Sequence, residues 1–172
     1  MAIGLLQIGL PERSYVPTAI AIVTMAIAPY LATILMSRAG KVSDRFVGDR
    51  SQRTPILIGT LATVLLGMAA LVILEAPASL ILVAGVAVIA LMIVTAITLR
   101  WKISIHTTIA AFFAVLQIVL YGPLGAVAIV IPVMVGWARL RLGAHTASQV
   151  IAGAVLGAVL GGAYAVAVGC FT

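Results

Sequence analysis

The strongest constraint on this chain is a series of six apolar stretches that contain no Lys, Arg, Asp or Glu. They cover residues 16–36, 55–74, 77–99, 104–120, 123–138 and 146–169. A hydrocarbon layer about 30 Å thick is crossed by about 20 helical residues, so stretches of these lengths predict transmembrane helices. Because hydrophobic residues make up 64% of the 172 positions and charged residues only 8%, an ordinary soluble domain is excluded.

The absence of period-two alternation favours helices over strands, and a bilayer leaves the edges of an open sheet without hydrogen-bond partners. We therefore predict an all-α, polytopic membrane protein with six transmembrane helices, forming a single domain over residues 1–172. Pro29 and Pro132 are expected to kink the first and fifth helices. Residues 1–10 are too short to span and lack the features of a signal peptide, so we expect an interfacial lead-in there.

Three glycines recur at intervals of four residues in the last apolar stretch: Gly153, Gly157 and Gly161. Such a stripe of small residues allows another helix to approach closely. Since a six-helix bundle has many internal faces, we expect this stripe to pack within the bundle. A contact between two copies of the chain is the alternative, and the oligomeric state stays open.

Threading the chain through six spans places residues 38–54, 100–106 and 139–145 on one side of the membrane, which we call the basic face. Nine of the ten basic residues belong to it: Arg38, Lys41, Arg45, Arg50, Arg53, Arg100, Lys102, Arg139 and Arg141. Only Arg13 falls on the opposite side. By the positive-inside rule the basic face is expected in the cytoplasm, with both termini outside, and the short loops are typical of a prokaryotic cell membrane protein.

The two histidines of the chain stand at the starts of two predicted helices on the basic face, His106 at the start of the fourth and His145 at the start of the sixth. Ser104 is placed to cap the first of these helices, and Thr146 with Gln149 forms a Thr-x-x-Gln capping box on the other. Helix N-termini beside arginines bind anions, and phosphate suits this geometry well. The pattern therefore predicts a phosphate site on the basic face.

The same residues resemble the three motifs of the type 2 phosphatidic acid phosphatase superfamily, which includes the vanadium haloperoxidases. The spacing in which five residues separate Arg139 from His145, and three separate His145 from Gln149, is similar to that of the third motif. That motif reads Ser-Arg, five residues, His, three residues, Asp. Ser104-Ile-His106 looks like the second motif, Pro-Ser-Gly-His. The first motif, Lys, six residues, Arg-Pro, is only approximated, because Arg45 precedes Arg53 by eight positions instead of seven. The resemblance covers nearly the whole chain and implies the helical bundle of that superfamily.

The resemblance also implies a role for each matching residue. His145 would attack phosphorus and form a phosphohistidine, while His106 would protonate the leaving oxygen and then activate water. Cationic and N–H groups would stabilise the transferred phosphoryl group. The candidates for this stabilisation are Arg139, Arg53, Ser104, and either Arg45 or Lys41 in the place of the motif lysine. No metal or other cofactor is expected.

Gln149 stands where the third motif has an aspartate. Its amide oxygen can accept a hydrogen bond from the imidazole, but it cannot stabilise a cationic ring as a carboxylate does. The departure favours substrates with a good leaving group, such as a diphosphate. It also leaves open an inactive relative that binds lipid phosphates or acts as a scaffold.

Two other classes of membrane protein fit the sequence less well. Asp44 and Asp49 could suggest a magnesium diphosphate site, but one sparse pair among arginines is more typical of a solvated loop. A transporter would be expected to carry polar or ionisable groups within its spans. The predicted spans are nearly free of them, and Gln117 is the main exception. The expected partners are membrane lipids and a lipid phosphate substrate, either a polyprenyl phosphate or diphosphate or a phosphatidate-type lipid, and no nucleic acid.

Overall fold

A computed structural model describes residues 1–40 and 50–169, with the side chains of residues 50–53 outside the description. The described residues form helices joined by short turns, with no strand among them, as predicted, and the chain divides into two compact units, Met1–Arg100 and Trp101–Thr172. Each unit is presented by itself below. The expectation of a single domain over the whole chain stays a prediction.

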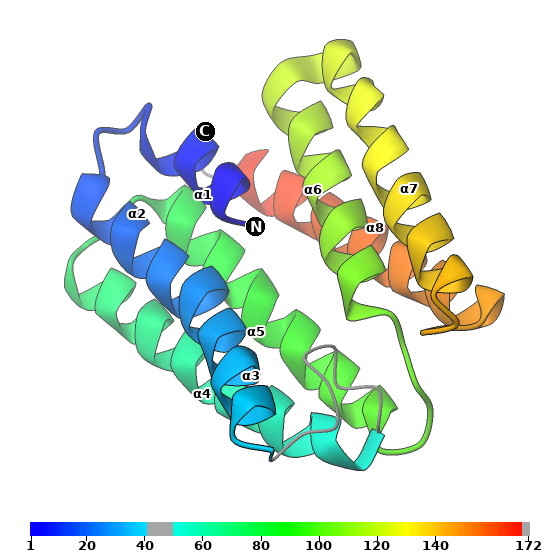
Figure 1. Cartoon of the computed structure of the whole chain (residues 1–172). Coiled ribbons are helices and arrows are strands. Elements are labelled where there is room, and N and C mark those ends of the chain that lie inside the picture. The colour runs from blue at the N-terminus through cyan, green and yellow to red at the C-terminus, as the bar shows by residue number, and fades with distance from the viewer. Residues whose placement is uncertain (41–49, 170–172) are drawn as a thin grey trace. The chain divides into compact units, whose positions relative to one another are not determined.

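The described residues of the first unit form five α-helices and one π-helical turn (Figure 1). They are α1 Ala2–Gly9, α2 Tyr15–Ile22, η1 Val23–Ile27, α3 Ala28–Arg38, α4 Arg50–Ile73 and α5 Ala78–Thr98. The elements α2, η1 and α3 form one apolar rod over Tyr15–Arg38, which packs beside α4, and α4 packs on α5. These bounds agree with the first three predicted spans, except that α4 begins five residues before Pro55.

The first predicted kink coincides with a change in helical pattern. The π-helical turn η1 lies directly before Pro29, which occupies the first turn of α3. Proline has no N–H, and its ring clashes with the carbonyl four residues earlier, here that of Met25. A wider turn at this point relieves the clash within a continuous apolar rod.

The N-terminal residues form more than the lead-in that the sequence predicts. They fold into α1, which packs against α2 and α5. Leu5 and Ile8, one turn apart, are both buried there. The helix therefore belongs to the core of the first unit.

The second unit consists of α6 Ile105–Tyr121, the 3-10 segment η2 Gly122–Ile129, α7 Val130–Arg141 and α8 Ala147–Gly169. Figure 1 shows α6 and α7 side by side as a hairpin, with η2 at its tip. Pro132 lies just after η2, near the start of α7, so the second predicted kink coincides with a break in the α-helix. The helix α6 contacts η2, α7 and α8, and it is the centre of the unit.

Five helical segments of the described chain are long and apolar enough to cross a membrane. They are Tyr15–Arg38, Thr54–Ile73, Ala78–Thr98, Ile105–Arg141 and Ala147–Gly169. The fourth contains the whole α6–η2–α7 hairpin, in which the 12 residues of α7 extend only about 18 Å. The chain is thus a helical membrane protein, and the hairpin occupies the place of the predicted fourth and fifth spans.

The glycine stripe of α8 packs within the second unit, as predicted. A Cβ added at Gly153 would lie 2.5 Å from the Ser104 carbonyl oxygen, and one at Gly161 would lie 2.7 Å from the Val115 Cβ. A Cβ at Gly157 would collide with the Thr108 carbonyl. The absent side chains at Gly153 and Gly157 let α8 approach the backbone at the start of α6, and the one at Gly161 leaves room for the Val115 side chain.

Replacing Gly157 with alanine should therefore destabilise the protein, because the added methyl group meets backbone that cannot rotate away. Overpacking of this kind costs about 1–3 kcal/mol. Thermal unfolding in detergent would measure the loss. Gly162→Ala is the matched control, since nothing lies within 4 Å of a Cβ added at Gly162 of the same helix. Equal unfolding temperatures for the two variants would contradict the packing described here.

Candidate functional site

The start of α6 and the start of α8 are joined by a backbone hydrogen bond. The N–H of Ser104 donates to the carbonyl oxygen of Gln149 at 3.3 Å. Close packing of Gly153 on the Ser104 carbonyl holds the same two segments together. His106, in the first turn of α6, and His145, just before α8, therefore belong to one end of the second unit. We call this place the α6–α8 junction and include in it Ser104, His106, Arg139, His145 and Gln149.

His145 is bound to Gln149 through its ring. The Nδ1 atom lies 3.0 Å from the Gln149 Oε1, and the same oxygen accepts the backbone N–H of Thr146 at 3.2 Å. A backbone N–H can only donate, so the shared atom of Gln149 is the carbonyl oxygen and not the amide nitrogen. That oxygen can only accept, and the Nδ1 of His145 must carry the proton. In the neutral ring, Nε2 is then the unprotonated nitrogen.

The capping box predicted for α8 forms in part. Gln149 accepts from the N–H of Thr146, as the motif requires. The Thr146 hydroxyl instead pairs with the Ser148 hydroxyl at 3.0 Å. One glutamine oxygen thus serves both the helix start and the histidine, which ties the orientation of the ring to the backbone of α8.

The helix α7 ends in a Schellman motif, which forms the turn before α8. Gly143 has φ +62°, the left-handed conformation that suits glycine, and its N–H donates to the Leu140 carbonyl at 3.0 Å. The N–H of Ala144 donates to the Arg139 carbonyl at 3.1 Å, and that of His145 reaches the same oxygen at 3.4 Å. The backbone of Arg139 therefore fixes where His145 stands, a link that the motif spacing alone does not reveal.

Arg139 lies on the side of α7 that faces α8. Three residues before it, Gly136 is buried, and a Cβ added there would lie 2.8 Å from the Val150 Cγ1 of α8. Residues three apart share a helix face, and the Arg139 side chain is half-buried. Its guanidinium thus belongs to the same side of α7 as the histidine that its carbonyl holds.

Ser104 was predicted to cap α6 and to donate to phosphate. It is the N-cap residue, but its hydroxyl makes no cap hydrogen bond to the helix backbone, so the predicted cap is wrong. The hydroxyl pairs instead with that of Thr107 at 2.8 Å, and both side chains are fully buried. Ser104 thus anchors the start of α6 in this conformation, and its expected contact with phosphate stays a prediction.

The two histidines differ in exposure. His145 is only 9% exposed, whereas the His106 side chain is exposed. A buried ring whose Nδ1 is held by the Gln149 oxygen is suited to a fixed attacking role, and an exposed ring is suited to exchanging protons with water.

The candidates for the first motif belong to the first unit. Lys41 and Arg45 lie outside the described residues, as do Asp44 and Asp49. Arg53 lies in the first turn of α4, and its side chain is outside the description. The second unit thus brings together Ser104, His106, Arg139, His145 and Gln149, and the roles of Arg45, Arg53 and Lys41 stay predictions.

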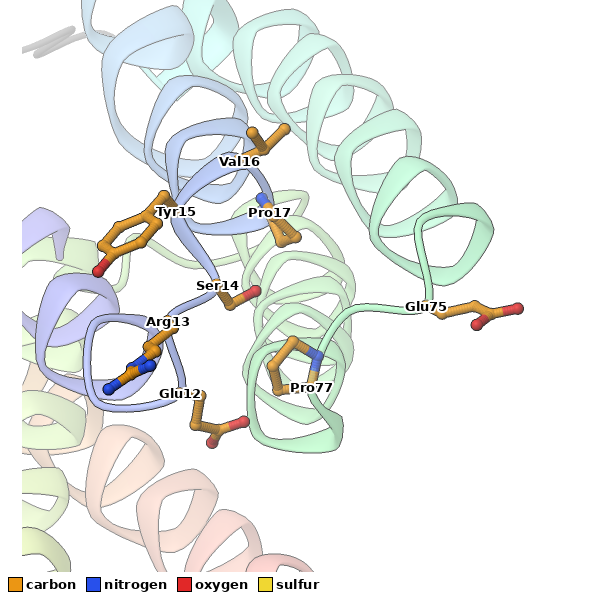
Figure 2. Close-up of a pocket in the computed structure, with 8 residues that line it drawn as sticks. All are labelled: Glu12, Arg13, Ser14, Tyr15, Val16, Pro17, Glu75 and Pro77. Carbon is orange, nitrogen blue, oxygen red and sulfur yellow. The ribbon is translucent and has the colours of Figure 1, made fainter.

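The apolar rod of the first unit runs from Tyr15 to Arg38. A hollow of about 460 Å³ opens at its Tyr15 end (Figure 2). It is lined by Glu12, Arg13, Ser14, Tyr15, Val16, Pro17, Glu75 and Pro77. The Glu12 carboxylate accepts the Ser79 hydroxyl at 2.7 Å, which ties the loop before α2 to α5. Figure 2 shows Glu75 pointing away from Glu12. Arg13 thus lies at the far end of the rod from Arg38, in agreement with the predicted threading.

Comparison with known proteins adds no relative to this picture. No family model, no curated protein and no solved structure matches the chain.

Proposed function

We propose that the chain is an integral membrane lipid phosphate phosphatase that works at the α6–α8 junction through a phosphohistidine on His145. The observation that carries this proposal is the shared Gln149 oxygen, 3.0 Å from the Nδ1 of His145 and 3.2 Å from the N–H of Thr146. This contact holds Nδ1 as the protonated nitrogen, so Nε2 keeps the lone pair that a nucleophile needs.

In the first step the Nε2 of His145 attacks phosphorus, and the bond from phosphorus to the lipid oxygen breaks. His106 gives its proton to that oxygen as it leaves. In the second step His106 takes a proton from water, which attacks the phosphohistidine and releases inorganic phosphate. Both histidines return to their starting states, so the cycle needs no added oxidant or reductant.

Charge in phosphoryl transfer spreads over the equatorial oxygens, so positioned cations and N–H groups supply most of the stabilisation. Arg139 is the nearest candidate, because its backbone is bonded to His145 and its side chain lies on the α8 side of α7. Arg53, with Arg45 or Lys41, is proposed to supply further positive charge. Ser104 is proposed to position the start of α6, since its hydroxyl is buried against Thr107.

The substrate is proposed to be a phosphate whose tail stays in the bilayer, since the junction lies at the ends of membrane-spanning helices. Polyprenyl and diacyl lipids fit this description equally. Because an amide stabilises a cationic imidazole less than a carboxylate does, the better leaving group of a diphosphate is favoured. We propose six crossings, with α6 and α7 as the fourth and fifth, and a junction on the cytoplasmic face of a prokaryotic membrane.

The second candidate is a lipid-phosphate-binding protein without catalysis, and the amide of Gln149 is the observation that favours it. The two functions differ in product. Purified protein should release inorganic phosphate from dispersed polyprenyl diphosphate or phosphatidate in the presence of EDTA, with vanadate as a competitor. Binding of these lipids that weakens in Arg139→Gln, with no phosphate release above the His145→Ala background, would select the binding protein instead.

A further inference from the structure

The two arginines near the end of α7 leave the helix in different directions. Side chains two positions apart on an α-helix are separated by about 200°. Arg139 is half-buried on the side that faces α8, whereas Arg141 is exposed. The Arg141 guanidinium lies over the ring of Trp137, 5.5 Å from the ring centroid. Arg141 therefore belongs to a different surface of α7 from the α6–α8 junction.

That surface continues along α7 as an apolar stripe. Val130, Val133, Met134 and Trp137 recur at the spacing of one helix face, and between 52% and 64% of each residue is exposed. The stripe belongs to a segment apolar enough for the membrane, so acyl chains are its natural neighbours. It ends one turn later at the positive charge of Arg141.

The order of groups along this face matches the order of groups in a phospholipid. Apolar side chains face the tails, and the amphipathic indole of Trp137 suits the depth where tails meet headgroups. The guanidinium follows at headgroup depth, where its planar fork matches the oxygens of a phosphate. Stacking on the ring limits the motion of Arg141 before a lipid arrives, so less side-chain entropy is lost on binding.

We infer that Trp137 and Arg141 form a binding surface for a bilayer lipid with an anionic phosphate headgroup, whose acyl chain lies along α7. The apolar stripe favours a lipid over a soluble anion, because a soluble anion would use the guanidinium alone. The inference does not depend on phosphatase activity, since the surface is separate from Arg139 and His145. It predicts a lipid neighbour that stays bound whether or not the junction is catalytic.

Tryptophan fluorescence can test this surface, because the chain has only 2 Trp residues and Trp101→Phe leaves Trp137 alone. The variant would be placed in vesicles that contain dibrominated phosphatidylglycerol or dibrominated phosphatidylcholine at equal mole fraction. A brominated lipid quenches tryptophan fluorescence only when it contacts the ring, so the ratio of quenching by the two lipids reports their relative binding. We expect about a fivefold preference for the anionic lipid, the size of one basic residue's interaction at a membrane surface.

Arg141→Gln in the same background should bring the preference close to one. Arg38→Gln is the matched control, since it removes an exposed cation at the end of α3. It should leave the preference unchanged. Brominated phosphatidylcholine should quench Trp137 equally in all variants. Equal quenching shows that the substitutions leave Trp137 in contact with lipid.

Equal quenching by the two brominated lipids in the Trp101→Phe protein would overturn the inference. So would a preference that survives Arg141→Gln. Inorganic phosphate, compared with chloride at the same ionic strength, should not displace the anionic lipid. Loss of the preference in phosphate would assign the guanidinium to a soluble anion. Phosphate release is measured separately, so failure here does not bear on the proposed function.

Discussion

His145→Ala is expected to reduce phosphate release from lipid phosphates to the background rate, a loss of about 10⁴-fold or more. The reason is that the Nε2 of this ring is the proposed attacking atom, and the contact of Nδ1 with the Gln149 oxygen fixes the tautomer that attack requires. Release of inorganic phosphate by purified protein measures the effect. Ser148→Ala is the matched control in the same helical turn, because it removes only a hydroxyl that pairs with Thr146.

His106→Ala should fail in a different way. Loss of a general acid costs about 10²–10⁴-fold, and the cost shrinks when the leaving group needs no proton. An aryl phosphate with an acidic phenol should therefore restore the first, rapid release of phenol in His106→Ala, while hydrolysis of the phosphohistidine stays slow without the base. Neither step should recover in His145→Ala. If both variants respond equally to the aryl substrate, the assignment of nucleophile and acid is wrong.

Gln149→Glu is expected to raise the maximal rate about tenfold, because a carboxylate of the same reach can accept from both Nδ1 and the Thr146 N–H. The added negative charge stabilises the cationic ring that forms during attack. It also favours the protonated ring in the resting enzyme, so the acidic limb of the pH–rate profile should move to higher pH. A full pH–rate profile of both proteins gives the rate and the limb together.

Gln149→Leu is the counterpart that keeps the size of the side chain and removes its oxygen. It loses both hydrogen bonds, so the ring can take either tautomer, and we expect a fall of about 100-fold. Gln149→Asp restores the residue of the third motif with a shorter side chain. A carboxylate that lowers the rate in both the Glu and the Asp variants would mean that the site is built around the amide.

Much of the fold follows from the sequence because apolar runs and glycine spacing act locally. The helix bounds agree with the predicted spans within a few residues over most of the chain. The stripe of Gly153, Gly157 and Gly161 has one physical use, close helix approach, and its partner is α6. The two histidine-bearing helix starts lie at the same end of the second unit because the chain runs out along α6 and back along α7 before α8 begins. This holds however far the α6–α7 hairpin extends.

The details that the sequence does not predict depend on which side of a helix meets its neighbour. Ser104 looks like a cap and a phosphate donor in the sequence, but packing against Gly153 buries it. Gly143 carries the signal of a helix C-terminus, a glycine after basic residues, but it is not part of the catalytic motif and its link to His145 is not visible in the spacing. The opposite directions of Arg139 and Arg141 follow from the bounds of α7, because the helix must include both residues.

Trapping of the intermediate tests the central claim most directly. Protein incubated with a lipid phosphate labelled with ³²P at the terminal phosphate would be quenched in alkali, which preserves phosphohistidine, and the labelled peptide would be mapped by mass spectrometry. We predict label on His145 in the wild-type chain, more of it in His106→Ala incubated with a ³²P-labelled aryl phosphate, and none in His145→Ala. Phosphate release without label on His145, or label that persists in His145→Ala, would contradict a phosphohistidine at the α6–α8 junction.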